Sequence, residues 1–400
     1  MPTTAIDSAD VGLGSAPAAT SCCDTPFPQH GRQILGPANR DLVDAYVRGQ
    51  TPGAIPLREL TMAPTFRCNA HCRQCTEQCA MQDAGAAQLS LANILHIVGR
   101  LDELGVRIVK LHGGEPSVHP GFLPMLRAIH RTKVQTIYVS NNGMLLGTLV
   151  DSLASLRDKL LVRISLNAGT ARTHQTVYCT PRPQFERILA GAAPLADRGV
   201  NLAFSTVVRP ETAGEIAQAA RHASQTGAGS ITLKPLMDPQ TKQLVWLPQP
   251  VRERIRRQIR AARGLESPGF RVLLSEALQV VLNADTPPVQ PKEFRTCPFT
   301  FFRAVLSPPQ PGVISTCPYQ RKSRAHRLPA GADEVDRCWL SSAGRTAALA
   351  VADARIMCTH WCERGAMAGY LWAMRQQYRR EGEAVLSQIP ICRDQHGPFI

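Results

Sequence analysis

The sequence predicts an α/β protein, a partial (β/α)6 barrel followed by a cysteine-rich C-terminal auxiliary domain. Between about Arg58 and Met237, short strand-like apolar runs alternate with stretches of helical apolar spacing, which is typical of βα units around a parallel sheet. Beyond Pro287 the chain instead carries six of its 13 cysteines. At 400 residues the chain exceeds a single core of roughly 100 to 150 residues, so one large domain with an appendage is expected.

Six strands are expected in the barrel, each marked by a short apolar run. They are Glu59 to Phe66, Val106 to His112, Thr136 to Ser140, Leu160 to Asn167, Val200 to Val208 and Ser230 to Met237. Helical spacing recurs between them, from Leu91 to Leu104 behind Ser90 as the N-cap, and from Phe185 to Leu195. In parallel α/β folds the active site gathers at the C-terminal ends of the strands, so the residues that follow each strand matter most.

The flanking segments complete the domain prediction. Residues 1–55 are rich in Ala, Ser, Pro, Gly and Thr without periodicity, which predicts a flexible N-terminal arm. The barrel is assigned to residues 56–248, bridging helices to 249–286 and the auxiliary domain to 287–400. The run Arg252 to Arg263 has its apolar residues at helical spacing, which predicts an amphipathic helix with a basic solvated face.

Composition limits the classes of partner. The net charge is +14 and the pI near 9.5, but the arginines are scattered, so nucleic acid is not an expected partner. No apolar run approaches the roughly 20 residues that a membrane span needs, and the N-terminus lacks the pattern of a secretory signal. A cytoplasmic protein without membrane contact is therefore expected. In such a chain, cysteines indicate metal ligation or catalysis more than disulfides.

Three cysteines directly after the first strand carry the strongest signal. Cys68, Cys72 and Cys75 are separated by three and then two residues, so their thiols can converge on one metal centre. Three thiolates on a four-iron cubane leave one iron with an open position. The alternative is a closed site, either structural zinc or an electron-transfer cluster, with Cys79 as a fourth ligand.

A second motif ends the second strand. Gly113, Gly114, Glu115 and Pro116 combine two glycines, which allow close backbone approach, with a carboxylate that can receive an ammonium group. An ordinary Gly-Gly turn is the simpler explanation for such a motif in isolation. A closed zinc site would not need such a turn one βα unit downstream. The three cysteines and this turn together therefore favour a cubane with one open iron position.

Together these motifs resemble the radical S-adenosylmethionine (SAM) superfamily, whose fold is a partial TIM-like barrel. The resemblance implies a 4Fe-4S cluster on the three cysteines and SAM on the open iron. It also implies an external reductant such as flavodoxin or ferredoxin, and reductive cleavage of SAM to a 5'-deoxyadenosyl radical. Glu115 would contact the methionine amino group. At the next strand ends, Asn141, Ser165 and Asn167 would supply polar groups to SAM. Many members have an aromatic residue before the third cysteine; here it is Gln74.

The C-terminal cysteines resemble those of the SPASM and twitch extensions, which carry auxiliary 4Fe-4S clusters. Cys297, Gly312 and Cys317 match the start of that pattern, although the full SPASM run is missing. The resemblance implies one auxiliary cluster, with Cys338 as a possible substitute for one of its ligands. The ligands expected on this basis are Cys297, Cys317, Cys358 and Cys362. A zinc-stapled cap is the alternative.

The resemblance extends to natural-product tailoring, as in antibiotic biosynthesis. The first expectation is a small-molecule substrate, a sugar or aminoglycoside-like intermediate that is dehydrated, epimerised or dehydrogenated, because the arm before Cys68 lacks the pattern of a folded peptide-recognition domain. The alternatives are modification of a ribosomal peptide and a non-enzymatic iron-sulfur protein. Cys179 could return a hydrogen atom to a substrate radical, or be an ordinary loop cysteine. His174 and Tyr178 are candidates for substrate contact or proton transfer.

Overall fold

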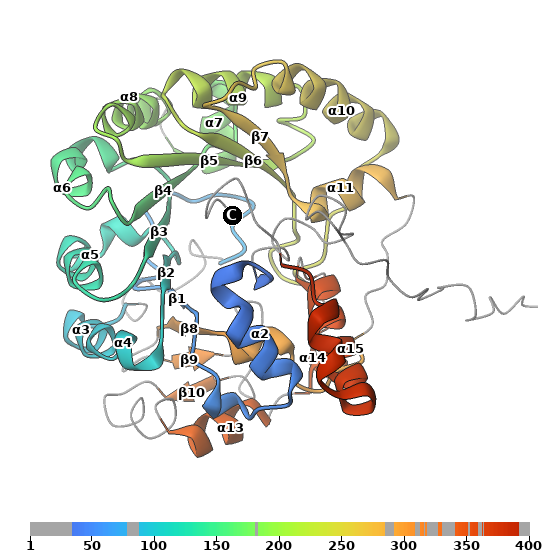
Figure 1. Ribbon diagram of the computed structural model, residues 1–400. Coiled ribbons are helices and arrows are strands. Elements are labelled where there is room, and N and C mark those ends of the chain that lie inside the picture. The colour runs from blue at the N-terminus through green and yellow to red at the C-terminus, as the bar shows by residue number, and fades with distance from the viewer. Residues whose placement is uncertain are drawn as a thin grey trace, which may run out of the picture.

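The computed structural model describes residues 34–77, 88–180, 183–284, 292–308, 313–315, 317, 327–329, 341–350, 353–358, 362 and 364–391. Its centre is a ten-stranded sheet in the order β10-β9-β8-β1-β2-β3-β4-β5-β6-β7 (Figure 1). The strands are β1 (Glu59–Met62), β2 (Ile108–Leu111), β3 (Thr136–Asn141), β4 (Leu160–Ser165), β5 (Asn201–Val208), β6 (Ser230–Pro235), β7 (Arg271–Leu274), β8 (Arg303–Ser307), β9 (Val313–Ser315) and β10 (Arg327–Pro329).

Eight of these strands, β8 and β1 to β7, pair in parallel. The order ends in β10 on one side and β7 on the other, so the sheet is open. This confirms the predicted α/β partial barrel. Each of the six expected strands is present, although most end earlier than expected.

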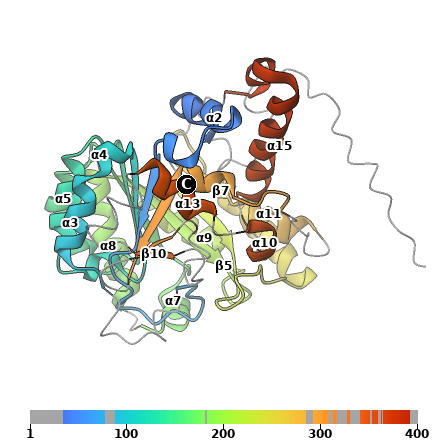
Figure 2. The same cartoon turned by 90° about the horizontal axis from the view of Figure 1, so that it is seen from below.

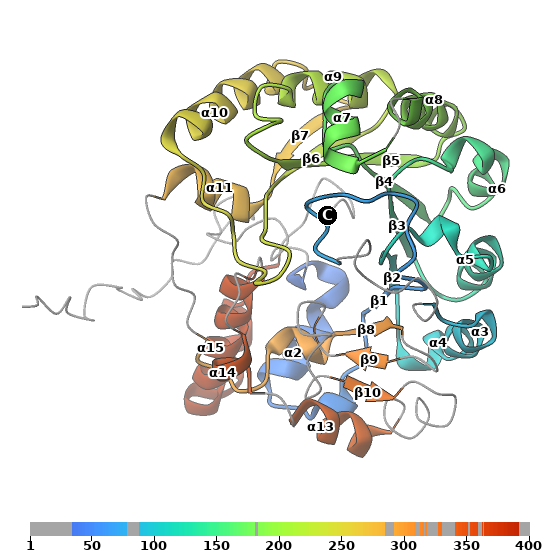
Figure 3. The ribbon, with the colours of Figure 1, turned by 180° about the vertical axis from the view of Figure 1, so that it is seen from behind.

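The α-helices are α2 (Arg40–Val47), α3 (Leu91–Gly99), α4 (Leu101–Leu104), α5 (Phe122–His130), α6 (Val150–Ala154), α7 (Ala171–Tyr178), α8 (Pro183–Asp197), α9 (Ile216–Gln225), α10 (Gln249–Arg263), α11 (Glu276–Asn283), α13 (Ser342–Ala350), α14 (Ala354–Met357) and α15 (Gly365–Glu381). Helices α3 to α6 and α8 to α10 lie along the convex side of the curved sheet, whereas α2 and α15 lie apart from this outer layer, as Figures 1 and 3 show. Short 3-10 helices are η2 (Pro37–Asn39), η3 (Pro52–Ala54), η5 (Pro116–Val118), η6 (Leu146–Thr148), η7 (Pro298–Phe301) and η10 (Gly382–Gln388). The Ser90 cap is confirmed, since its Oγ accepts from Asn93 N at 3.2 Å.

Two apolar cores hold these elements together. The larger lies between the sheet and its helices and includes Val109, Leu111, Val162 and Ile164. The smaller joins α2, η7 and α15 and includes Tyr46 and Met367. Figure 2 shows α2 and α15 side by side, apart from the outer helices α3 to α5.

Two of the expected segment descriptions need correction. The flexible arm was expected to reach residue 55, but residues 34–55 contain α2, whose Val43, Tyr46 and Val47 are buried in the smaller core. Burial of these three apolar side chains stabilises the folded state of the segment, which its overall composition did not indicate. The segment 249–286 contains α10 and α11, but also β7, which extends the parallel sheet beyond β6.

Helix α10 is amphipathic as expected, with Ile255, Ile259 and Ala262 buried. In the part of the chain that the structure describes, no helix combines the length and the apolar character of a membrane span.

Candidate active site

The three barrel cysteines lie on the loop after β1, which we call the cysteine loop (residues 63–77). Cys68, Cys72 and Cys75 are each partly buried. The loop is held against the end of α7, because His71 N donates to Tyr178 O at 3.1 Å and Arg73 N donates to Val177 O at 3.3 Å. The last carbonyls of a helix have no hydrogen-bond partner within the helix, so these two bonds satisfy the carbonyls of α7 and the N–H groups of the loop at the same time.

The electrostatics of the loop suit an iron-sulfur cluster. Burial raises the pKa of Cys68 to about 11, with further contributions from Glu115 and Cys75, and it raises that of Cys72 above this. Thiolates in this position therefore need a cationic partner, which iron provides. Among the described residues, no three His, Cys, Asp or Glu side chains are arranged to hold a single metal ion. A cubane places each thiolate on a different iron, so its ligands surround a larger volume than those of one ion.

The two glycines after β2 pack against the cysteine loop itself. Gly113 has a φ of +126°, which favours glycine, and a Cβ on Gly114 would lie 2.1 Å from Arg67 O. Gly114 N donates to Thr65 O at 2.9 Å, and Glu115 N donates to Arg67 O at 2.8 Å. The sequence indicated close backbone approach to a ligand, whereas the contact in the structure is with the chain's own cysteine loop.

Glu115 lies at the centre of this junction with 1% of its surface exposed. Its carboxylate accepts from Asn142 N at 2.7 Å and from Ser117 N at 3.0 Å. Burial raises the pKa of Glu115, and these hydrogen bonds oppose the rise. Pro116 begins η5, directly after it. A buried carboxylate held in this way can stabilise a bound ammonium group.

Asn142 is a site residue that sequence reasoning missed. Its backbone N–H reaches Glu115, and its Nδ2 donates to Asn69 Oδ1 at 2.6 Å, so it connects the carboxylate to the cysteine loop. Its only sequence signal was its place next to Asn141 at a strand end. Cys79, the alternative fourth thiol, lies outside the described residues.

The other strand-end residues differ in whether their side-chain oxygens already accept hydrogen bonds within the protein. Asn141 Oδ1 accepts from Gly143 N at 2.7 Å, and Asn167 Oδ1 accepts from Val207 N at 2.8 Å, so both oxygens are used within the protein. Ser165 is partly exposed at the end of β4, with its backbone oxygen accepting from the Tyr178 hydroxyl. Binding of a ligand by the Ser165 side chain remains a prediction.

The three candidate catalytic residues all come from α7 and its C-cap. His174 is fully buried, stacked on Tyr178 with ring centroids 4.2 Å apart, and burial lowers its pKa to about 4. The Tyr178 hydroxyl donates to Ser165 O at 2.5 Å, and burial raises its pKa well above the usual value. The His174 ring also packs edge-on against Phe185 of α8, with centroids 5.7 Å apart, whereas the Tyr178 hydroxyl is bound to the end of β4. Both side chains are buried, and a role of either in substrate contact or proton transfer remains a prediction.

Cys179 is different, because it is exposed at the C-cap of α7 with a φ of 52°. Its charge would raise the pKa of Cys72, which puts it near the cysteine loop. Hydrogen-atom return by Cys179 remains a prediction. Loss of solvent deuterium from the product of Cys179→Ala would support it, and an unchanged product would contradict it.

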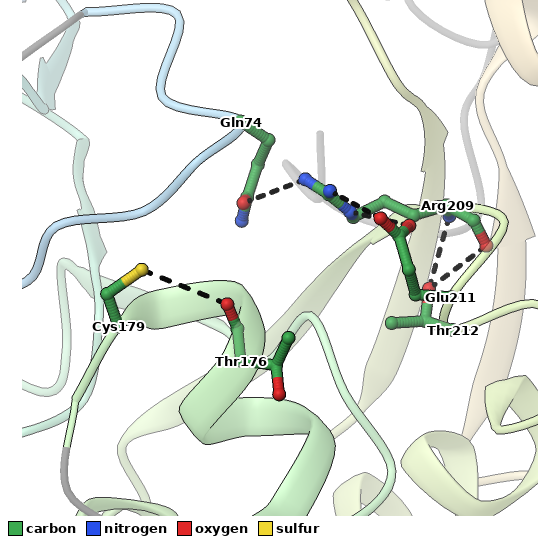
Figure 4. A network of polar contacts seen from close by, with 6 residues as sticks. All are labelled: Gln74, Thr176, Cys179, Arg209, Glu211 and Thr212. Carbon is green, nitrogen blue, oxygen red and sulfur yellow. Dashed lines mark hydrogen bonds and ion pairs between the residues drawn. The ribbon is translucent and has the colours of Figure 1, made fainter.

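Gln74, the residue before the third cysteine, is buried and points toward a buried arginine (Figure 4). Its Oε1 accepts from Arg209 Nη1 at 3.1 Å. Arg209 also pairs with Glu211 at 3.0 Å, and Thr212 Oγ1 accepts from its backbone N–H at 3.1 Å. Sequence reasoning did not find Arg209. At the position where many members of the resembled superfamily have an aromatic ring, this chain has the amide of Gln74, which is bound to the guanidinium of Arg209 directly after β5.

Four of the C-terminal cysteines, Cys297, Cys317, Cys358 and Cys362, form a second group. Burial and the neighbouring Cys362, Cys317 and Cys297 thiolates raise the pKa of Cys358 to about 12, and burial with Cys362 and Cys317 does the same for Cys297. The thiols are therefore brought within electrostatic range of one another from η7, β9, α14 and the turn before α15. Cys338 and Gly312 lie outside the described residues.

Comparison with known proteins finds relatives of the barrel. Residues 62–223 match the Radical SAM superfamily. GTP 3',8-cyclase of Synechocystis sp. is 30% identical over 179 residues, which cover 45% of this chain and 52% of the cyclase. Mycofactocin maturase MftC of Mycobacterium tuberculosis is 27% identical over 172 residues, 42% of each chain. The chain thus spans about half the length of the curated relatives it matches.

Solved structures share the fold at low identity. SuiB of Streptococcus suis, bound to S-adenosylmethionine, matches with a TM-score of 0.55 and 13% identity, covering 69% of this chain and 63% of SuiB. Native anSMEcpe with bound AdoMet matches with a TM-score of 0.55 and 14% identity, covering 84% of this chain and 100% of its own. The cofactors expected from the sequence, SAM and a 4Fe-4S cluster, are those of the matched family.

Proposed function

We propose that the chain is an enzyme that cleaves SAM reductively on a cluster held by Cys68, Cys72 and Cys75, because its residues 62–223 match the Radical SAM superfamily. When bound, the cluster and SAM supply the 5'-deoxyadenosyl radical that removes a hydrogen atom from a substrate carbon. The observation that carries the proposal is the junction of the cysteine loop with the Gly113–Glu115 turn, because the buried carboxylate of Glu115 lies within electrostatic range of Cys68, one of three partly buried thiols on that loop.

The chain's own residues have separate tasks in this proposal. Glu115 receives the SAM ammonium, and Asn142 fixes its carboxylate relative to the cysteine loop. Ser165 offers a hydroxyl to the nucleoside or carboxylate of SAM. Tyr178 positions the end of β4 through its bonds to Ser165 O and Asn167 N, at 2.5 and 3.4 Å. We propose this positioning role for Tyr178 in place of a catalytic one.

The test is formation of 5'-deoxyadenosine by anaerobically reconstituted enzyme with SAM and dithionite. Cys68→Ala, Cys72→Ala and Cys75→Ala should each abolish it, since losing one thiolate destabilises the cluster. Cys79→Ala should retain both iron and cleavage. Loss of the barrel iron in Cys79→Ala would instead favour a closed four-thiolate site, and wild-type enzyme that forms no 5'-deoxyadenosine would sink the proposal.

For the substrate, we propose a peptide. Native anSMEcpe was solved with AdoMet and the Kp18Cys peptide, and the match to that structure covers 99% of its chain. SuiB was solved with its precursor peptide SuiA. The missing peptide-recognition domain was the sequence argument for a sugar, but nearly all of the anSMEcpe chain is matched here, so this architecture accommodates a peptide without such a domain.

The second candidate is a small sugar-containing molecule, as the sequence first indicated. The identity to GTP 3',8-cyclase, whose name gives a nucleotide substrate, favours it. Transfer of deuterium to 5'-deoxyadenosine separates the two. Transfer from a deuterated peptide would support the first candidate, and transfer from deuterated GTP or a deuterated sugar alone would replace it with the second.

A further inference from the structure

The concave face of the sheet carries polar side chains that the proposed SAM chemistry does not use. Successive side chains of a strand point to opposite faces. In β4, Val162 and Ile164 belong to the apolar core on the convex side, so Arg163 and Ser165 face the concave side. Closed (β/α) barrels fill this space with layers of apolar side chains. Here Arg163 and Ser165 are polar and partly buried, which favours a space that receives a ligand.

Strand register gathers several of these side chains. Lys110 of β2 is paired with Tyr138 of β3, and Ser140 of β3 with Arg163 of β4. The Arg163 guanidinium carbon lies 5.0 Å from the centre of the Tyr138 ring, and its Nη2 donates to Ser140 Oγ at 3.2 Å. His112 follows β2 directly and lies within electrostatic range of Arg163.

Of the cationic side chains described in this region, Lys110 has a carboxylate partner and Arg163 does not. Lys110 Nζ lies 2.8 Å from a Glu59 oxygen, so these two charges compensate each other. Arg303 and Arg364 lie beside the C-terminal cysteines, whose thiolates raise the pKa of Arg303 against the effect of burial. Within the described ranges, no carboxylate forms an ion pair with Arg163, whose recorded contacts are a neutral hydroxyl and an aromatic ring.

Three buried polar atoms of this group also lack a hydrogen-bond partner among the described residues. They are Arg163 Nε, the Tyr138 hydroxyl and His112 Nε2. Tyr138 has 5% of its surface exposed. Leaving a buried donor unpaired costs about 1–3 kcal/mol, so three such atoms in adjacent side chains call for a common partner. Burial and the charge of Arg163 lower the pKa of His112 to about 4, which leaves a neutral imidazole that can still donate one hydrogen bond.

We infer that Arg163, Tyr138 and His112 anchor an oxyanion of the substrate, a carboxylate or a phosphate, on the concave face of β2 to β4. A guanidinium binds both anions through paired N–H donors, and the phenol and imidazole add neutral donors. The inference rests on the proposed function and deepens it, since it gives the substrate a negative group that binds to the concave face of the sheet. An acidic peptide and a nucleotide are the two sources of that group.

The experiment is equilibrium dialysis of cluster-loaded enzyme with two probes, GTP and the peptide acetyl-Gly-Glu-Gly-amide. Wild type should bind at least one of them saturably, and Arg163→Met should raise its Kd at least about tenfold. Arg163→Lys keeps the charge and should lose less, and Tyr138→Phe removes only a hydroxyl. Arg198→Met removes an exposed arginine that pairs with Asp151, and should leave the Kd unchanged.

Binding of GTP alone would identify phosphate as the group, and binding of the peptide alone would identify carboxylate. No saturable binding by wild type, or an equal Kd for wild type, Arg163→Met and Tyr138→Phe, would overturn the inference. The outcome is separate from that of the proposed function. An enzyme that forms 5'-deoxyadenosine but shows no Arg163-dependent binding refutes the anchor alone, whereas one that forms none refutes the radical chemistry itself.

Discussion

At the residue scale, the site depends on how closely two segments of backbone approach each other. The turn after β2 donates two hydrogen bonds to the cysteine loop after β1, from Gly114 N to Thr65 O and from Glu115 N to Arg67 O. Only a residue without a Cβ fits at Gly114, because Phe66 O and Arg67 O occupy the space. The glycine thereby sets the distance between the carboxylate of Glu115 and the thiols.

Replacing this glycine should loosen the cysteine loop. In Gly114→Ala the new Cβ would lie 2.1 Å from Arg67 O, so the loop must move, with a loss of about 1–3 kcal/mol of unfolding free energy. We expect a lower Tm and a lower iron content after reconstitution. Gly99→Ala is the matched control, because nothing lies within 4 Å of its Cβ, and it should be neutral or slightly stabilising. Equal iron content in the two variants would contradict this account.

At the element scale, α7 and α2 each support a cysteine-bearing segment. The C-terminal carbonyls of α7 receive the N–H groups of His71 and Arg73 from the cysteine loop. Helix α2 packs against η7, which follows Cys297, through the Tyr46 ring, whose centroid lies 4.9 Å from that of Phe301. Arg375 of α15 covers the same tyrosine at 4.9 Å. The segment before the barrel is therefore part of the C-terminal region.

Truncating Tyr46 tests this contact. Tyr46→Ala removes a side chain that is 2% exposed and should lower the unfolding free energy by about 3–5 kcal/mol. Denaturant unfolding of the intact chain measures the loss. Asp41→Asn, an exposed change on the same helix, should alter stability by less than about 1 kcal/mol. If residues 34–55 formed a flexible arm, the two variants would be indistinguishable.

At the scale of the whole molecule, one open sheet connects two groups of cysteines. Strand β1 leads into the cysteine loop, and its neighbour β8 follows η7 and Cys297. Parallel pairing of β1 with β8 therefore fixes both groups to one framework. Arg303 of β8 lies beside the second group, where it offsets the negative charge of the thiolates.

Iron content tests whether the second group holds a cluster. Reconstituted protein should contain about eight irons per chain, on the premise of two cubanes. The double variant Cys297→Ala, Cys317→Ala should retain about four and still cleave SAM, because the barrel cysteines are intact. Stoichiometric zinc with about four irons in the wild-type protein would replace the auxiliary cluster by a zinc site.

The sequence alone determined the six central strands, the cysteine loop and the Gly-Gly turn, because each depends on residue types at short spacing. Alternation of apolar residues is a local property, and so is the reach of three thiols on one loop. Gly113 and Glu115 could be predicted as site residues for the same reason. That the two glycines pack against the cysteine loop could not be predicted.

Only the tertiary structure decided what those elements contact. Strands β7 and β8 were not expected from the sequence, because their place in the sheet depends on pairing with β6 and β1, which no local pattern encodes. Helix α2 is stabilised by α15 from the other end of the chain. Burial of His174 and Tyr178, and the meeting of Arg163 with Tyr138, follow from sheet register and helix packing. These contacts join segments that are far apart in the sequence. They depend on the total apolar area buried and not on the spacing of neighbouring residues along the chain.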